Sequence, residues 1–414
     1  MRRARADGMK ILLLGCMVFI LLSTAMEIAL PSSMMDFKLV FYPAQSLIQH
    51  HDPYISGCIN LPTTLFILFP FVVLGYSPAH FLWIALTAGS LILASLLIWD
   101  LGPSGASILS GGLVALLLVN SAVVVMLGNT AGIVCGLCVI AVYCFVSARF
   151  FPAGILCLAI SLAIKPHNAG LVWLYFLLAG KVYRRRALQT LLVTIALSLP
   201  AVLFVSQVAP GWLQEWHSNI LENSIDGAIN DPAFASLGKF SPSMQIDLQS
   251  AISAFRNDPG IYNPMSYLLF TPVLLVWAFV TLRSHPSPTR TWLALAAIAP
   301  LSMLPTYHRA YDAKLLLLTV PAFAMLWDEG GLIARLALLV NAVGILLTSE
   351  FPWIILFALI NNLHLSATGT ASRLLMAILG LLTPLLLLAM SIFYLVVYAR
   401  RAPPRVISTD SAVT

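Results

Sequence analysis

Charged residues are scarce in this chain. Of its 414 residues, 9% are charged and 60% are hydrophobic, whereas a soluble domain carries roughly 25% charged residues. This composition excludes an ordinary soluble protein. It predicts an all-α polytopic integral membrane protein, with residues 1–414 forming one membrane domain.

The sequence also lacks the short motifs of several membrane machines. It contains no Walker sequence, no G-x-G-x-x-G, no H-E-x-x-H, no internal repeat and no low-complexity tract. The missing nucleotide and zinc motifs argue against an ATP-driven pump and an intramembrane zinc protease. Because no long soluble segment is present, any chemistry is expected at the membrane boundary, without a metal or a cofactor.

The cysteines give no disulfide pattern. Six are scattered along the chain, and all but Cys58 lie in apolar segments. Cys135 and Cys138 form a C-x-x-C sequence, but no second pair and no histidine lies nearby. Such residues usually pack as small polarizable groups, so we expect no disulfide framework.

Basic residues cluster beside apolar runs, which explains the net charge of +6 without a nucleic-acid partner. The clusters lie at residues 2–10, 181–186 and 400–405, and the positive-inside rule places them in the cytoplasm. The first apolar run, Ile11–Leu30, is long enough to span a bilayer. No clear A-x-A cleavage site follows it, so we expect a signal anchor and two cytoplasmic termini.

Apolar runs predict about twelve transmembrane helices, at residues 10–30, 79–99, 106–127, 131–148, 151–165, 167–181, 187–208, 262–282, 291–304, 314–327, 332–348 and 372–398. Two further apolar stretches, 61–76 and 351–365, do not fit the alternation of sides. They are expected to be re-entrant or interfacial, unless one of them spans.

Two larger segments, 31–60 and 209–261, are expected to face outward. The second is rich in carboxylates, Trp and Asn, which suits sugar binding by stacking and hydrogen bonds. An ordinary solvated loop explains the same residues equally well.

Asp36 is the most informative charged residue, because it follows the first span directly. Charges near membrane depth cost roughly 3 kcal/mol and usually mark function. In a helix that starts after Pro31, Asp36 lies one or two turns from Tyr42. We predict that Asp36 is a general base and that Tyr42 binds substrate. The alternative for Asp36 is a helix cap or a solvated carboxylate. Asp52 and Tyr54 are further substrate-binding candidates, although Asp52 is better explained as a turn former.

Two polar breaks interrupt later apolar runs. Lys165 begins the sequence Lys-Pro-His-Asn between two short helices, where a lysine beside free helix ends suits a phosphate. The alternative is a lysine that snorkels at the end of a span. Asn129, in Gly128-Asn129-Thr130, is a weaker candidate for substrate binding, because a tight turn explains the same residues.

The segment 307–314 places six polar or aromatic groups in eight positions between two apolar spans. His308, Arg309 and Lys314 are predicted to bind a donor phosphate, since a guanidinium holds such a group in a fork. Asp312 is predicted to bind substrate. The alternative is an interfacial aromatic belt with an Arg309–Asp312 salt bridge.

Asp36, Lys165 and the segment 307–314 all fall on one side of the membrane in the predicted topology. A base, a lysine and an Arg/His clamp suit glycosyl transfer from a lipid phosphate. The carboxylate deprotonates an acceptor hydroxyl, and the cations stabilise the departing phosphate.

This pattern resembles glycosyltransferase family 87 of the GT-C superfamily. The resemblance lies in an outer-face Asp36 soon after the first span, an aromatic pair and an Asp-Pro-Tyr element. Lys165-Pro166, followed by an apolar helix and three arginines at 184–186, is similar to the family's Lys-Pro segment and basic loop. The run 307–314 looks like the late outer loop of relatives. Gly128-Asn129 departs from the family's usual Gly-Gln, and the resemblance covers roughly residues 10–330.

The resemblance implies a GT-C-type helix bundle with Asp36 as the catalytic base and inversion at the anomeric carbon. It implies a decaprenyl- or undecaprenyl-phosphate sugar, most often mannose, as the donor, and a lipid or glycan hydroxyl as the acceptor. The expected location is the cell inner (plasma) membrane, with the active site facing outward and membrane lipids around the helices.

Two other functions fit the composition. One is a transporter or a flippase for lipid-linked sugars, and the other is a structural or assembly subunit. Transporters often show inverted repeats and polar sites at the midplane. Here we detect no repeat, and the polar groups gather at one face, which favours the enzyme.

Overall fold

The computed structural model describes residues 2–30, 33–101, 106–225, 227–233, 245–366 and 369–401. Within these ranges the chain is helical and contains no strand; it forms one isolated antiparallel bridge, between Gln245 and Arg309. The predicted all-α class is therefore confirmed for the described part of the chain.

Among the described residues, seven helices are long and apolar enough to cross a membrane, which confirms a multi-pass protein. They are α1 (Arg2–Ala29), α5 (Tyr76–Asp100), α6 with α7 (Ser107–Val119 and Ala122–Leu127), α11 (Lys181–Val208), α14 (Pro259–Arg283), the 3₁₀ helix η2 with α16 (Ala310–Thr319 and Val320–Glu329), and α19 (Thr370–Arg401).

The other apolar helices are shorter or bent. α17 (Gly331–Leu347) and α18 (Phe351–Asn362) pass the same test together but are bent by 57°, which gives up to eight spans. α8 (Thr130–Val146) and α9 (Phe151–Ile164) are apolar helices shorter than 18 residues. α10 (Pro166–Leu178) and α15 (Pro288–Ser302) are two further short helices. The count of twelve stays a prediction.

Three helices that are buried along almost their whole length, α8, α15 and η2, form the centre of the bundle. α8 packs against α5, α9 and η2, while α15 packs against α19 and η2. A helix that is hydrophobic all round belongs in a core, and almost every residue of α8 is apolar and buried. The first residues of α8 and η2 thereby come together at one end of the bundle.

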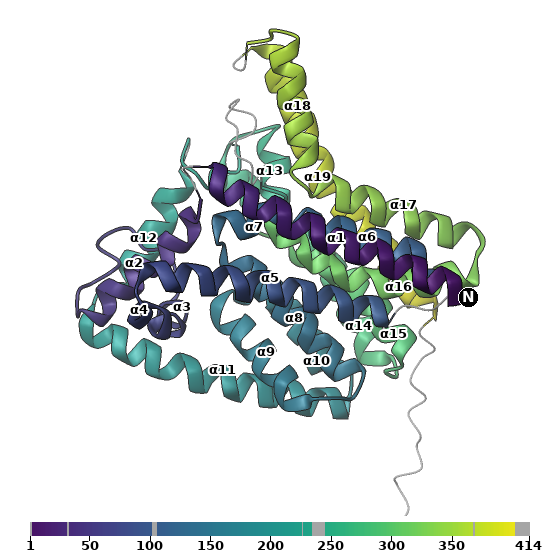
Figure 1. Ribbon diagram of the computed structural model, residues 1–414, viewed down its shortest axis with the longest axis horizontal. Coiled ribbons are helices and arrows are strands. Elements are labelled where there is room, and N and C mark those ends of the chain that lie inside the picture. The colour runs from purple at the N-terminus through teal and green to yellow at the C-terminus, as the bar shows by residue number, and fades with distance from the viewer. Residues whose placement is uncertain are drawn as a thin grey trace, which may run out of the picture.

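Short helices collect at that same end, on the left of Figure 1 beside the last turn of α1. The first predicted outer segment contains α2 (Met35–Ile48), and the second contains α12 (Trp212–Ser224) and α13 (Leu248–Ser253). The apolar stretch 61–76 forms two short helices, α3 (Pro62–Ile67) and α4 (Phe69–Leu74). Residues 31, 32, 226 and 234–244 of the two outer segments lie outside the described residues.

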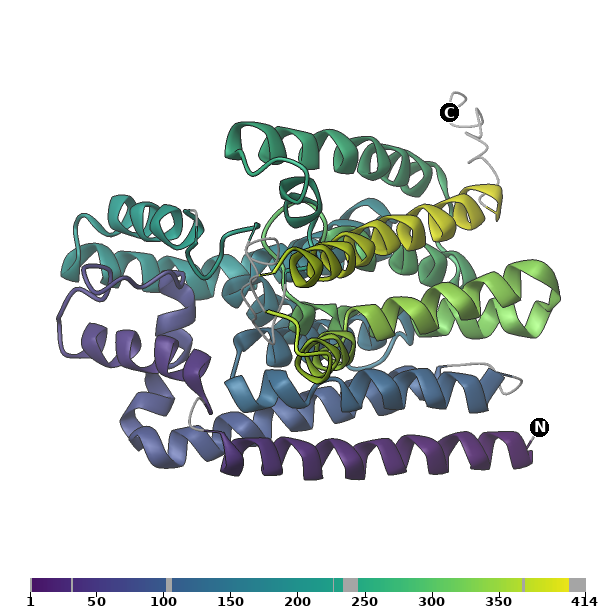
Figure 2. The ribbon, with the colours of Figure 1, turned by 90° about the horizontal axis from the view of Figure 1, so that it is seen from above.

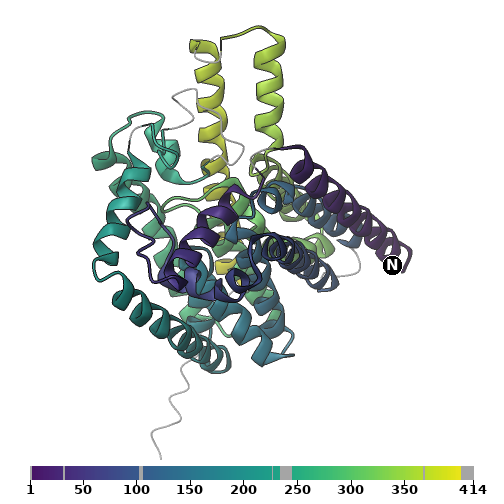
Figure 3. The ribbon, with the colours of Figure 1, turned by 60° about the vertical axis from the view of Figure 1, so that its left-hand side comes forward.

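The stretch 351–365 forms α18, which pairs with the first half of α19. Figure 3 shows these two helices side by side, projecting from the body, and Figure 2 looks down on the same pair nearly end-on. They share a small apolar core of Trp353, Leu356, Ile360 and Met376. This hairpin lies apart from the end of the bundle where α2 and α12 meet.

Candidate functional site

A pocket of about 510 Å³ lies where α2, α12 and the first turn of α8 meet. Its wall is formed by α2, the loop 53–60, Asn129 and Thr130, Lys165, Asn223, residues 229–230 and three residues of the segment 307–311. Three cations (Lys38, Lys165 and Arg309) and one carboxylate (Asp36) line it among the described residues. The pocket therefore carries an excess of positive charge, which suits an anionic ligand.

The turn between α7 and α8 fixes the start of α2, and hence the position of Asp36. The backbone N–H of Met34 donates to the carbonyl of Met126 over 2.6 Å. Gly128 has φ +65°, and a Cβ there would lie 2.7 Å from Met34 Cε and from Phe37 Cβ. Only a glycine allows both this backbone conformation and this close approach.

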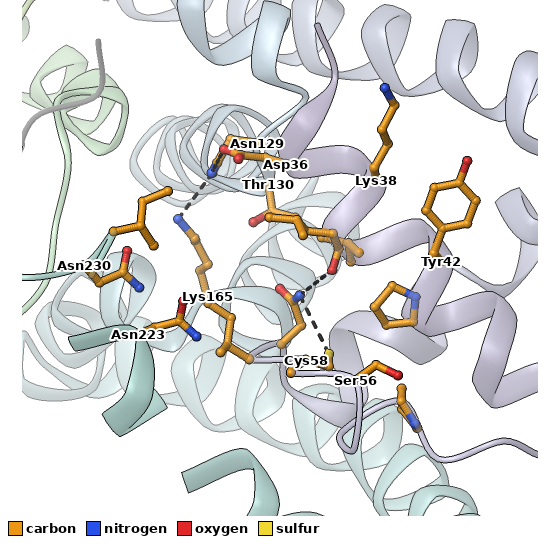
Figure 4. Close-up of a pocket in the computed structure, with 18 of the residues that line it drawn as sticks. Asp36, Lys38, Tyr42, Ser56, Cys58, Asn129, Thr130, Lys165, Asn223 and Asn230 are labelled. Atoms are coloured by element: carbon orange, nitrogen blue, oxygen red, sulfur yellow. Dashed lines mark hydrogen bonds between the residues drawn. The ribbon is translucent and has the colours of Figure 1, made fainter. Parts of the chain in front are cut away.

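Asn129 follows this turn and connects α8 to α2. Its Oδ1 accepts from the backbone N–H of Ala131 over 2.8 Å, which caps α8, and its Nδ2 donates to Asp36 Oδ2 over 2.6 Å. Because the cap needs an acceptor, the amide NH₂ must face the carboxylate. Figure 4 shows the two side chains next to each other.

Asp36 is half-buried in the first turn of α2. Burial raises the pKa of its carboxyl above the ordinary value, and the hydrogen bond from Asn129 opposes that rise. Lys165 and Arg309 also lower the pKa, whereas the charge of Asp312 raises it. A carboxylate with a raised pKa is a better proton acceptor than an exposed aspartate.

Lys165 reaches the pocket from the break between α9 and α10. Pro166 starts α10, so the chain turns at Lys165. The ammonium group donates to Asn129 Oδ1 over 3.4 Å and to Asp312 Oδ1 over 3.2 Å, and it lies 5.2 Å from the centre of the Tyr311 ring. Figure 4 shows the lysine extended toward Asn129.

Arg309 also lines the pocket. Its guanidinium Nη2 donates to the carbonyl of Ile229 over 2.7 Å and to Asn230 Oδ1 over 3.0 Å. Its backbone N–H donates to Asp312 Oδ2 over 2.9 Å. These two contacts hold the guanidinium beside the pocket, where a guanidinium can bind an anion through paired hydrogen bonds.

The segment before Arg309 is held from behind by Asp247. Its Oδ1 accepts from the backbone N–H of Ser250, which caps α13, and its Oδ2 accepts from the backbone N–H of His308 over 3.1 Å. Asp247 is fully buried, and burial raises its pKa to about 6. The sequence offered one sign of this role, because Asp is a preferred residue before a helix.

The structure brings Asp36, Tyr42, Asn129, Lys165 and Arg309 to one pocket. These residues were predicted from four separate sequence segments, and all of them line the pocket. Tyr42 is half-exposed and stacks on Tyr76, with ring centres 5.8 Å apart. Their proximity is observed, while their roles stay predictions.

Asp52 and Tyr54 do not line the pocket but support a loop that does. Asp52 Oδ1 accepts from the backbone N–H of Tyr54 over 2.8 Å, which is the turn expected of an Asp-Pro element. Tyr54 is buried, and its hydroxyl donates to the carbonyl of Asn60 over 3.1 Å. Asn219 of α12 donates to the carbonyls of Tyr54 and Cys58, which fastens the loop to α12.

His308, Asp312 and Lys314 also lie behind the pocket wall rather than on it. His308 is fully buried, and its Nδ1 bonds to the carbonyl of Thr306 over 2.8 Å. Burial lowers the pKa of His308, so its ring is neutral near pH 7 and lacks the charge predicted for a phosphate clamp.

Lys314 points in another direction. It is 1% exposed and donates to the carbonyl of Asn120 over 2.6 Å, at the turn between α6 and α7. The predicted eight-residue cluster is therefore divided, with Tyr307, Arg309 and Tyr311 on the pocket and the other charged groups inside the protein.

The lysine and asparagine residues of the lining that were not predicted as site residues are Lys38, Asn60, Asn223 and Asn230. Lys38 stands two positions after Asp36, so its sequence neighbourhood could have identified it. The three asparagines carry no local pattern. They reach the pocket through the loop 53–60 and through α12 and the turn that follows it.

Comparisons of the chain with models of known protein families, with curated proteins and with solved structures found no match.

Proposed function

We propose that the protein is a membrane glycosyltransferase that moves a sugar from a polyprenyl-phosphate carrier to a hydroxyl group of a lipid or glycan acceptor. The observation that carries this proposal is the pocket in which Asp36 lies with Lys165 and Arg309. A half-buried carboxylate supplies a base, and two cations supply a site for a phosphate.

The reaction needs one proton acceptor and one anion site. The acceptor oxygen forms a bond to the anomeric carbon of the sugar, its proton passes to Asp36, and the bond from that carbon to the phosphate oxygen breaks. The phosphate changes from a diester to a monoester and gains negative charge as it leaves. In this proposal Lys165 and Arg309 stabilise that growing charge.

The lining supports inversion at the anomeric carbon. A retaining mechanism through a covalent intermediate uses a second carboxylate as the nucleophile. Asp36 is the one carboxylate among the described residues that line the pocket. A single displacement, with Asp36 as the base, is therefore the mechanism that the described lining supports.

The remaining lining residues suit a sugar and a lipid. Asn60, Asn223 and Asn230 offer amide groups for sugar hydroxyls. Leu39 and Ile229 are 59% and 55% exposed on the same lining and offer apolar contact to a polyprenyl chain. The sequence resemblance to family 87 makes mannose the first sugar to test.

The proposed topology follows the positive-inside rule. The cluster 181–186 begins α11, and the opposite end of α11 approaches the pocket through contacts of Phe204 and Val205. If the basic end is cytoplasmic, the pocket faces outward. We propose about twelve membrane-embedded helices of GT-C type in the plasma membrane, with both termini cytoplasmic.

The test is sugar transfer by the purified full-length protein in lipid, with radiolabelled polyprenyl-phosphate mannose and membrane lipids as acceptors. Wild type is compared with Asp36→Asn and with Asp52→Asn. Asp52 lies outside the pocket, and an asparagine there can still accept the hydrogen bond from the backbone N–H of Tyr54 that forms the turn. We expect transfer by wild type and Asp52→Asn and none by a folded Asp36→Asn. Equal transfer by all three removes Asp36 from the mechanism.

The same preparation distinguishes an enzyme from a transporter or a flippase. A transporter or a flippase moves the labelled lipid between leaflets without forming a glycosylated product. Movement without any new product, across several lipid-linked sugars, refutes the proposed function.

A further inference from the structure

We propose that Asp312 is a positioning residue that holds both phosphate-binding cations and connects them, through Asn129, to Asp36. This inference rests on the proposed function, because it assigns Lys165 and Arg309 to the donor phosphate. Asp312 itself does not line the pocket.

Asp312 is fully buried, and both of its oxygens are engaged. Oδ1 accepts from Lys165 Nζ over 3.2 Å and from Asn168 Nδ2 over 2.7 Å. Oδ2 accepts from the backbone N–H of Arg309 over 2.9 Å. One carboxylate thus fixes the side chain of one cation and the backbone of the other, which come from α9–α10 and from the start of η2.

All three of these partners are donors. An asparagine at position 312 has one acceptor oxygen, and its NH₂ group would face a donor whichever way the amide turns. It would also leave the Lys165 ammonium without its buried counter-charge, and unpaired buried charge is costly. The carboxylate, rather than a polar group of the same shape, is therefore what the arrangement requires.

The contacts continue from Asp312 to the base. Lys165 Nζ lies between Asp312 Oδ1 and Asn129 Oδ1, and Asn129 Nδ2 donates to Asp36. A phosphate that draws Lys165 toward the pocket must compete with both oxygens. The base and the phosphate site are thus parts of one hydrogen-bonded chain, with Asp312 as its buried anchor.

The decisive comparison uses Asp312→Asn and the double variant Asp312→Asn/Asn168→Asp. The double variant returns a carboxylate to the neighbouring position, which is one 2.7 Å hydrogen bond away. Asn341→Ala serves as the stability control, because Asn341 of α17 is fully buried, bonds to Thr319 and Tyr394, and does not line the pocket. All variants are made in the full chain, and folding is checked by thermal unfolding in detergent.

The first readout is binding of farnesyl phosphate, which measures the phosphate site without turnover. We expect Asp312→Asn to bind on the order of 10- to 100-fold more weakly, by analogy with the loss of a group that orients a metal-binding residue. The double variant should regain most of that affinity, and Asn341→Ala should match wild type. Wild-type affinity in Asp312→Asn overturns the inference.

The second readout is the pH dependence of sugar transfer. The charged and titratable groups around Asp36 are Lys165, Arg309, Asp312 and Tyr311. Asp312 disfavours ionisation of Asp36, so its neutralisation should move the acid limb of the pH profile to lower pH. A buried residue with only a structural role would lower activity and leave the acid limb in place.

Each result decides between the two proposals. If wild type transfers sugar and binds farnesyl phosphate but Asp312→Asn behaves like it, the positioning role is wrong and the proposed function stands. If wild type neither binds nor transfers, the proposed function fails and the inference fails with it. Should Asp312→Asn not fold, the double variant is compared directly with wild type. An affinity of the double variant for farnesyl phosphate more than tenfold below that of wild type counts against the inference.

Discussion

Replacement of Asn129 tests how the site controls its base. Asn129 has two separable roles, because Oδ1 caps α8 and Nδ2 donates to Asp36. Asn129→Ser keeps an oxygen that can cap the helix but is too short to carry a donor to Asp36. Asn129→Ala removes both interactions and serves as the matched comparison.

The expected shift follows from the strength of the lost bond. A hydrogen bond to a charged group contributes about 1.5–3 kcal/mol, and 1.36 kcal/mol corresponds to one pKa unit. Because Asp36 is half-buried and solvent replaces part of the bond, the lower end of this range applies. We expect the pKa of Asp36 to rise by about one unit in both variants.

The assay is the pH dependence of kcat/KM for sugar transfer, combined with thermal unfolding. The acid limb should move upward by about one pH unit in Asn129→Ser and in Asn129→Ala. Only Asn129→Ala should also lose the cap, which costs about 1 kcal/mol of stability. An acid limb that stays in place or moves downward in Asn129→Ser refutes the assigned orientation of the amide.

Three further perturbations follow from the same contacts. Gly128→Ala should lower both stability and transfer, because φ is +65° and the new Cβ would meet Met34 and Phe37 at 2.7 Å; thermal unfolding and initial rates measure this, and wild-type values contradict the positioning of Asp36 by this turn. Lys314→Met should reduce thermal stability but leave the KM for the donor unchanged, since Lys314 is buried against Asn120; an increase in donor KM would restore Lys314 to the phosphate site. Asp247→Asn should remove a pH dependence of stability. Burial raises the pKa of Asp247 from 3.8 to about 6, so the folded state retains a proton that the unfolded chain releases. The stabilisation that this proton gives the folded state is fully present below about pH 4 and is lost as the pH rises to 6. Unfolding curves between pH 4 and 7 measure how the free energy of unfolding changes with pH. An equal pH dependence in wild type and variant contradicts the raised pKa of Asp247.

Helices and their ends were largely predictable from the sequence. The predicted spans 131–148, 151–165 and 372–398 correspond to α8, α9 and α19 within a few residues. Apolar runs and prolines are local properties, and lipid leaves few alternatives to a helix. The number of helices that cross the membrane was less accessible, because short helices such as α3, α4 and α18 can be placed only against their neighbours.

The candidate site was predictable only in part. Asp36, Lys165 and Asn129 were found because each interrupts or borders an apolar run, where a polar residue is costly. The segment 307–314 was found as a dense polar group, but its pattern does not tell which side chains face the pocket. An extended chain followed by a 3₁₀ helix sends neighbouring residues in different directions, so Arg309 and Lys314 point to different places.

The sequence by itself determined that the protein is a helical membrane protein with polar groups at the ends of apolar segments. These properties depend on composition and on residues a few positions apart. The tertiary structure decided which groups meet. Asp312 contacts Lys165 across 147 positions, and Asn129 contacts Asp36 across 93. Such pairs form only when packing of the central helices brings distant segments together, so their hydrogen bonds leave no trace in local sequence.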